Sequence, residues 1–264
     1  MALLQMLQQI EQQEWVDIPT GWLQGRTLYG GLAAGMMMHK AQTAMNDSRK
    51  ALLSCSITFV GPIQFAAVKL TAEVLRQGKS VTSIEVRLWQ DDAVQSILVA
   101  SFGTGRESQL QVCNEAVAPD YPAVEQLNIM PSNAKTPECF KQCQLAWAEG
   151  HYPFTGSNVP DFGGWFRFDP HLHSDRAMTL ADFMILTDIW PPGVLPMLNC
   201  VAPASSLTWQ MSFVHPLQHQ LCDWFKYQVI TDFSGDGYAI ESAHIWDKND
   251  RLIALSRQTV TVFT

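Results

Sequence analysis

The chain has 264 residues, of which 47% are apolar and 16% charged, so it is long enough to bury a large core in one domain or two. Its formal net charge of −8 argues against a nucleic-acid partner, because phosphate binding requires clustered Lys and Arg. No run of about eighteen apolar residues and no basic signal segment is present, which predicts a cytoplasmic protein without stable membrane insertion.

Hydrophobic patterns predict the first elements. Residues 2–14 have the spacing of an amphipathic helix, and 28–45 that of a helix rich in small residues such as Gly31 and Gly35, which would admit a close neighbour. The runs that follow alternate or cluster apolar residues over strand lengths, with turn signals between them, and indicate an antiparallel meander over 51–63, 68–78, 81–90 and 94–103.

The next segment, 105–160, is rich in proline and predicts a long connection with one short helix around 137–148. Strand signals resume at 163–168. A short, mostly buried helix is then expected within 179–198, because Thr179 can cap it and Asp182 follows three residues later like the acidic partner of a capping box. This helix must end before Pro191.

The second half of the chain repeats the first. SITFVGPIQ can be laid on QMSFVHPLQ, LYGGLAAG on LADFMILT, and LVASFG on IALSRQ, with separations of 154, 152 and 155 residues. Internal repetition of this kind decides the fold class before any single motif does. The sequence therefore predicts two copies of one helix-plus-sheet unit, packed side by side.

Taken together, these motifs resemble the double-hotdog acyl-CoA thioesterases of the bacterial thioesterase II type. The resemblance also covers the leading helix, VLRQGKS, SIEVRLWQ, GGWFRF, SLTWQMSFVHPL and LIALSRQTV, and leaves out only the connection. It implies an α+β double hotdog, with two tandem units that each have a central helix wrapped by a curved antiparallel sheet. We expect a first unit at 1–108, a connection at 109–158 and a second unit at 159–264.

The resemblance also implies a catalytic set. The family uses an Asp on the second helix, a Thr or Ser on the following strand and a Gln on the last strand, and these fall on Asp182, Ser206 and Gln258. The family normally has an Asp-His pair two residues after the hydroxyl residue, where this chain has Thr208 and Trp209. Either Ser206 or Thr208 could therefore supply the hydroxyl.

Such a set could hydrolyse a thioester. Asp182 could take a proton from water, while Gln258 and a hydroxyl fix that water in place. The N–H groups of Gly30 and Gly31, at the start of the first predicted helix, could bind the substrate carbonyl as it becomes an oxyanion. The alternative for Asp182 is that it only caps its helix.

The implied function is therefore an acyl-CoA thioesterase, a hydrolase of fatty acid metabolism that releases free fatty acid and CoA, with acyl-CoA as its partner and a homodimer or higher homo-oligomer as its assembly. The alternative is a non-catalytic acyl-CoA or lipid binding protein on the same scaffold. A third possibility is a hotdog hydratase, but the Asp-x-Asn-Pro and His pattern of that branch is not found in this sequence. We expect no cofactor and no metal, because His171 and His173 have no third soft ligand at zinc spacing.

Overall fold

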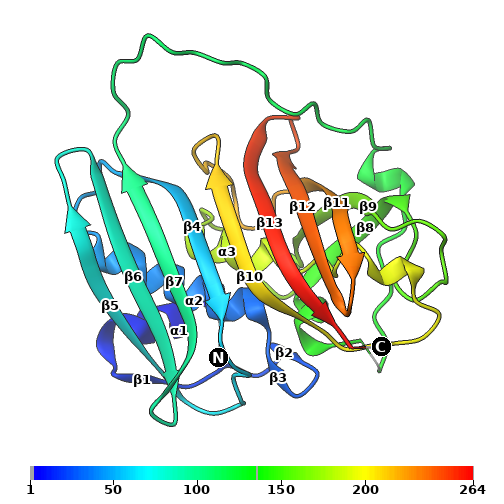
Figure 1. The fold of residues 1–264 in the computed structure, drawn as a ribbon, viewed down its shortest axis with the longest axis horizontal. Helices are drawn as coiled ribbons and strands as arrows, with labels where there is room; N and C mark the ends of the chain where they lie inside the picture. Colours follow the sequence, from blue (N-terminus) through cyan, green and yellow to red (C-terminus); the bar gives the residue numbers. More distant parts are fainter. Residues whose placement is uncertain (1–2, 135, 264) are drawn as a thin grey trace.

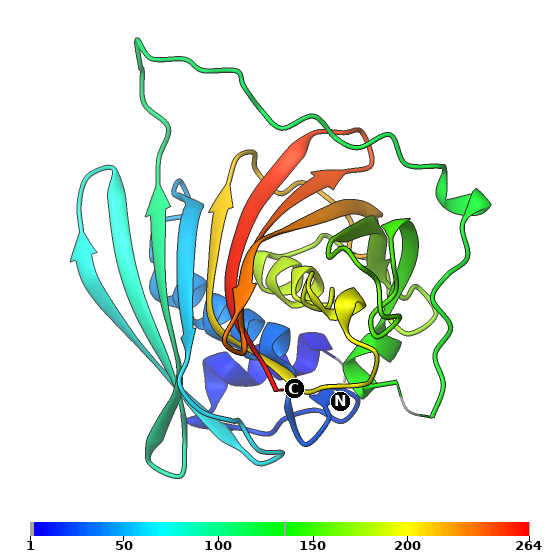
Figure 2. The same cartoon turned by 45° about the vertical axis from the view of Figure 1, so that its right-hand side comes forward.

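A computed structural model of the protein describes residues 3–134 and 136–263. Its main feature is a curved antiparallel sheet of 11 strands in the order β1-β5-β6-β7-β4-β10-β13-β12-β11-β9-β8 (Figure 1). Two helices, α2 (Gly30–Ala44) and α3 (Leu180–Thr187), pack against each other inside the curve of this sheet (Figure 2). The predicted α+β double hotdog is therefore confirmed.

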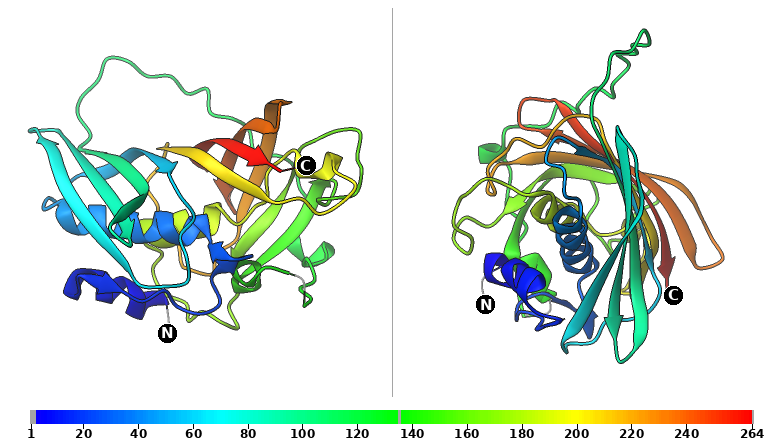
Figure 3. Two further views of the ribbon diagram at one scale, coloured as in Figure 1. Left: turned by 60° about the horizontal axis from the view of Figure 1, so that its bottom comes forward. Right: turned by 90° about the vertical axis from the view of Figure 1, so that its left-hand side faces the viewer.

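The first unit follows the predicted order closely. Helix α1 (Leu3–Gln12) buries Leu3, Met6, Leu7 and Ile10, one face of an amphipathic helix, and packs on α2 (Figure 3). Its strands are β1 (Trp15–Val16), β4 (Ala51–Phe59), β5 (Val68–Gln77), β6 (Val81–Gln90) and β7 (Ala93–Gly103), and β2 (Leu23–Gln24) and β3 (Thr27–Leu28) form a separate hairpin before α2.

The second unit has the same plan with a shorter helix. Its strands are β8 (Cys143–Gly150), β9 (Phe162–Phe168), β10 (Ala204–Phe213), β11 (Phe225–Gly235), β12 (Tyr238–Asp247) and β13 (Leu252–Val262). Short 3-10 helices occupy Val124–Gln126, Glu138–Gln142 and Leu195–Met197. The two units become one sheet where β10 pairs with β4, with Trp209 opposite Ile57.

Close packing of the two central helices explains the small residues of α2. A side chain at Gly35 would place its Cβ 2.8 Å from the backbone carbonyl of Ala181 and into the side chain of Ile185, both on α3. Tyr29, which precedes α2, donates a hydrogen bond of 2.7 Å to the carbonyl of Ile185. The start of α2 is thus fixed against α3, and this contact brings residues of the two units together.

The segment between the units differs from the expected connection. Instead of a helix around 137–148, the structure has the 3-10 helix Glu138–Gln142 followed directly by β8, which pairs with β9 at the far edge of the sheet. Residues 104–123 contain no helix or strand and arc outside the sheet (Figure 1). Within the part of the chain that the structure describes, no helix is long and apolar enough to cross a membrane.

Candidate active site

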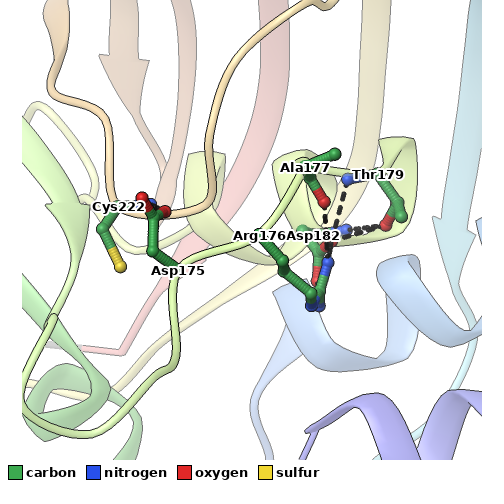
Figure 4. Close-up of polar contacts among 6 residues, drawn as sticks. All are labelled: Asp175, Arg176, Ala177, Thr179, Asp182 and Cys222. Atoms are coloured by element: carbon green, nitrogen blue, oxygen red, sulfur yellow. Dashed lines mark hydrogen bonds and ion pairs between the residues drawn. The ribbon is translucent and has the colours of Figure 1, made fainter.

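Asp182 lies in the capping box that the sequence predicts. The Thr179 side chain accepts a hydrogen bond from the Asp182 amide at 3.2 Å, and the Thr179 amide donates to the Asp182 carboxylate at 2.8 Å (Figure 4). The Arg176 guanidinium donates one hydrogen bond to each oxygen of the Asp182 carboxylate, at 2.7 and 2.8 Å. The carboxylate is fully buried, and the bidentate arginine offsets the cost of burying its charge.

This arrangement separates Asp182 from the rest of the predicted set. Among the described residues, its side chain makes hydrogen bonds only to Arg176 and Thr179, and none to Ser206 or Gln258. A general base needs a free lone pair facing its water, whereas these oxygens already accept four hydrogen bonds. The expected grouping of Asp182 with Ser206 and Gln258 is therefore wrong.

Ser206 and Gln258 do meet, as expected. The hydroxyl of Ser206 donates to the Gln258 side-chain carbonyl at 2.7 Å. A β-bulge makes this contact possible: Ser206 is opposite Val260 and Thr208 is opposite Thr259, so Leu207 is the extra residue. The bulge turns Ser206 to the concave face and leaves Thr208 exposed on the other. Of the two hydroxyls, the structure brings Ser206 to Gln258.

The carboxylate beside this pair belongs to Asp188. The Gln258 amide donates to Oδ1 of Asp188 at 3.2 Å, so one chain of hydrogen bonds runs from Ser206 through Gln258 to Asp188. Asp188 is the C-cap residue of α3, six residues after Asp182 in the first turn. The sequence analysis expects the carboxylate beside Gln258 at the start of this helix, whereas the one found there is at its end.

Gly30 and Gly31 complete the cluster from the first unit. An added Cβ on Gly30 would lie 3.0 Å from Oδ2 of Asp188, so the carboxylate rests against the first turn of α2. The amides of Leu32 and Ala33 donate to the carbonyl of Tyr29, which leaves those of Gly30 and Gly31 outside the ladder of the helix. The structure therefore brings Gly30 and Gly31 together with Ser206 and Gln258, as predicted.

The surroundings of Asp188 change its acidity. The pKa of the carboxyl is raised from 3.8 to about 7, because burial outweighs the opposite effect of the hydrogen bonds from Gln258 and from the backbone amide of Gly31. Asp188 still reaches solvent in part, as do Gln258 and Ser206. A partly accessible carboxyl with a pKa near neutrality can exchange a proton with a bound water around pH 7.

The contacts of His171 and His173, the two histidines that the sequence offers as possible metal ligands, are those of ordinary loop residues. The ring of His173 packs against Phe168 at 5.1 Å and Trp22 at 6.3 Å between ring centres, and burial lowers its pKa. The backbone amide of His171 donates to Asp169. Within residues 3–134 and 136–263, no three or more His, Cys, Asp or Glu side chains form a group that could hold a metal ion.

The fold and this cluster define a double-hotdog protein with a polar site where its two units meet. The chain belongs to the acyl-CoA thioesterase family: the family model of the N-terminal domain matches residues 18–104, and that of the C-terminal domain matches residues 116–262. A comparison with curated proteins gave no match.

Solved structures share the fold over most of the chain. A conserved protein with a hot dog fold from Alicyclobacillus acidocaldarius has a TM-score of 0.80 at 20% identity, with 95% of this chain and 92% of that one covered. The tesB protein of Mycobacterium avium subsp. paratuberculosis has a TM-score of 0.77 at 16% identity, with 100% of both chains covered. An acyl-CoA thioesterase II from Mycobacterium marinum has a TM-score of 0.70 at 19% identity, with 89% of this chain and 90% of that one covered.

Proposed function

We propose that this protein hydrolyses fatty acyl-CoA to free fatty acid and CoA, with a water molecule held by Asp188, Gln258 and Ser206 as the nucleophile. The observation that supports it is the chain of hydrogen bonds from Ser206 to Gln258 and from Gln258 to Asp188, which ends against the first turn of α2. Family membership supplies the thioester substrate class.

In this proposal Asp188 is the general base. Its carboxylate takes one proton from the water while the water oxygen bonds to the thioester carbonyl carbon, which gives a tetrahedral oxyanion. When the oxyanion collapses, the C–S bond breaks and the CoA thiolate recovers the proton from Asp188. A positioned base of suitable pKa contributes roughly 10²–10⁴ in rate, and a pKa of about 7 suits this task near neutral pH.

Gln258 and Ser206 orient the reactants. The Ser206 hydroxyl donates its proton to Gln258, which fixes the amide so that its N–H group points at Asp188. The lone pairs of Ser206 stay available to accept from the water. Together these contacts would hold the carboxylate and the water in one geometry, and such positioning is itself a large part of catalysis.

The carbonyl oxygen of the substrate would face the start of α2. The N-terminus of a helix carries a partial positive charge from its unpaired N–H groups, which suits a developing oxyanion. The amide of Gly31 already contacts Asp188, so we assign the substrate carbonyl to Gly30. Phe59, whose ring lies 3.5 Å from the Cβ position of Gly30, offers an apolar contact for the acyl group.

The test is release of free thiol from short- to long-chain acyl-CoAs by the wild type, Asp188→Asn and Asp182→Asn. We expect release by the wild type, a loss of roughly 10²–10⁴ in kcat for Asp188→Asn, and retained kcat for Asp182→Asn at a temperature where it stays folded. Equal release by wild type and Asp188→Asn would discard this site. Binding of acyl-CoA without release on any chain length would favour the non-catalytic binding protein.

A further inference from the structure

A second buried carboxyl, that of Glu241, lies beside the proposed site and is not used by the mechanism above. Glu241 as a whole is only 4% exposed to solvent. Glu241 is on β12, directly opposite Gln258 on β13 and Thr231 on β11. Side chains that face each other across neighbouring strands have their Cβ atoms roughly 5 Å apart, so Glu241 shares the concave face with Gln258.

Glu241 also holds the turn that follows Asp188. Its Oε2 accepts a hydrogen bond of 2.7 Å from the amide of Gly193. The carbonyl of Gly193 accepts from the Asp161 amide at 2.9 Å, and the Asp161 carboxylate accepts from the amide of Thr231 at 2.7 Å. Both sides of Gly193 are thus tied to the second unit, five residues after Asp188.

The turn has little freedom to shift. A side chain at Gly193 would meet Thr231 at 2.9 Å and Val229 at 3.0 Å, so its backbone lies directly on β11. Trp190, in the same turn, stacks on Tyr227 with the rings 5.1 Å apart and 6° from parallel. Removing the Gly193 contact would leave a buried N–H without an acceptor, which is unfavourable and would loosen the turn.

We propose that Glu241 is a positioning residue for Asp188: it holds the 190–193 turn on β12, opposite Gln258, and so keeps a second carboxyl on the side of the sheet where the proposed base lies. This inference rests on the proposed function, in which Asp188 is that base. It assigns Glu241 two effects, one geometric through the amide of Gly193 and one electrostatic through its charge.

The electrostatic effect follows from the groups that face this pair. The pKa of Glu241 is raised to about 7, mainly by burial and to a smaller extent by the charges of Asp188 and Asp161, while the hydrogen bond from Gly193 acts in the opposite direction. Tyr227 faces both Glu241 and Asp188, and its pKa is raised well above its ordinary value by burial and by these two charges, so it stays neutral near pH 7. Tyr29 and Cys139, which face Asp188, also have raised pKa values and stay neutral. Coupling between two carboxyls is mutual, so a charge on Glu241 disfavours a charge on Asp188.

The test separates the two effects with two substitutions. Glu241→Gln keeps an oxygen acceptor for Gly193 and removes the charge, so the acid limb of the kcat profile should move about 0.5–1 pH unit lower, with KM within about twofold of wild type. Glu241→Ala removes the oxygen acceptor for Gly193 as well as the charge. Its kcat should therefore fall at least about tenfold at the optimal pH, with little change in KM. Asp247→Asn is the control, because Asp247 is also buried on β12 but at its far end, where it contacts His219, Asn249 and Arg251.

A readout independent of turnover keeps the inference testable if no thioester is cleaved. Carbon-13 NMR of the side-chain carboxyls, with Asp188 assigned by Asp188→Asn, follows its titration directly. A lower pKa of Asp188 in Glu241→Gln, with no change in Asp247→Asn, supports the inference. An unchanged pKa of Asp188, or a pH profile that superimposes on that of wild type, overturns it. Failure of the proposed function would be seen separately, because the wild type would then release no thiol from any acyl-CoA.

Discussion

Gly30 stands where any side chain would disturb the Asp188 carboxylate. Gly30→Ala would place a Cβ 3.0 Å from Oδ2 of Asp188 and 3.5 Å from the ring of Phe59, closer to the oxygen than most real Cβ contacts. We expect kcat for thiol release to fall by about tenfold or more, because a small displacement of a catalytic group is costly. Gly25→Ala is the control, since no atom lies within 4 Å of its Cβ position, although its φ of +70° strains any side chain. Full activity in Gly30→Ala would contradict the proposed geometry.

The bulge in β10 gives the two neighbouring hydroxyls different roles. Ser206→Ala removes the donor to Gln258, so the amide of Gln258 is less firmly oriented toward Asp188, and we expect kcat to fall by roughly tenfold. Thr208→Ala changes a side chain exposed on the opposite face and should leave kcat within about twofold. Steady-state kinetics on one acyl-CoA measure both. A larger effect from Thr208→Ala would reverse the assignment.

The sequence predicts which residues lie together where the pattern is local, and misses a neighbour that only tertiary packing brings in. Gln258 and both glycines follow short motifs on well-defined elements. Asp182 stands out in the sequence because it occupies a recognisable capping box. Asp188 has only a weak signal, as an acid at the end of an apolar helix just before Trp190 and two prolines. Only the pairing of β10 with β13 and the approach of α2 show that this end of the helix faces Gln258.

At the level of elements, Asp182 has a structural task at the start of α3. It completes the capping box with Thr179 and pairs with Arg176, whose side chain is 24% exposed. Asp182→Asn would weaken these contacts and leave a less well compensated Arg176. We expect a loss of roughly 1–3 kcal/mol in the free energy of unfolding, measured by urea denaturation, with the slope of the transition unchanged. A stability equal to that of wild type would show that the capping box contributes little.

Most elements were predictable because their hydrophobic periods are long and clear. The helices at 28–45 and within 179–198 and the meander from 51 to 103 appear within a few residues of their expected bounds. The strand β8 was not predicted, because CQLAWAEG follows prolines and reads equally as a short helix by its apolar spacing. The segment becomes a strand because it pairs with β9, whose free edge offers hydrogen bonds to a nearby extended segment.

At the scale of the whole molecule, the candidate site combines different residues from the two units of the repeat. Asp188, Ser206 and Gln258 come from the second unit, while the first contributes glycines at the start of α2. Neither unit carries the complete cluster, and the β4–β10 pairing together with the α2–α3 contact is what assembles it. The candidate residues named from the sequence come from both predicted units, but which end of each helix meets the other unit depends on tertiary packing.

The carboxyls of Asp188 and Glu241 also affect the stability of the whole protein as pH changes. The pKa of Asp188 is raised from 3.8 to about 7 and that of Glu241 from 4.5 to about 7, so the folded state keeps protons that the unfolded state releases between these values. Their contribution to stability is therefore fully present below about pH 4 and is lost as pH rises through 7. Glu241→Gln removes one of these groups and retains an acceptor for Gly193.

We therefore expect Glu241→Gln to melt at a higher temperature than wild type at pH 8, by several degrees for a gain of roughly 1–3 kcal/mol, and the difference to shrink as pH falls toward 4.5. Scanning calorimetry at pH 5, 6.5 and 8 measures it, with Asp247→Asn as a variant of the same strand that loses turn contacts at every pH. A gain of equal size at all three values would mean that packing, and not ionisation, separates the two proteins. A gain confined to high pH would show that the fold gives up stability in order to keep a second carboxyl beside Asp188.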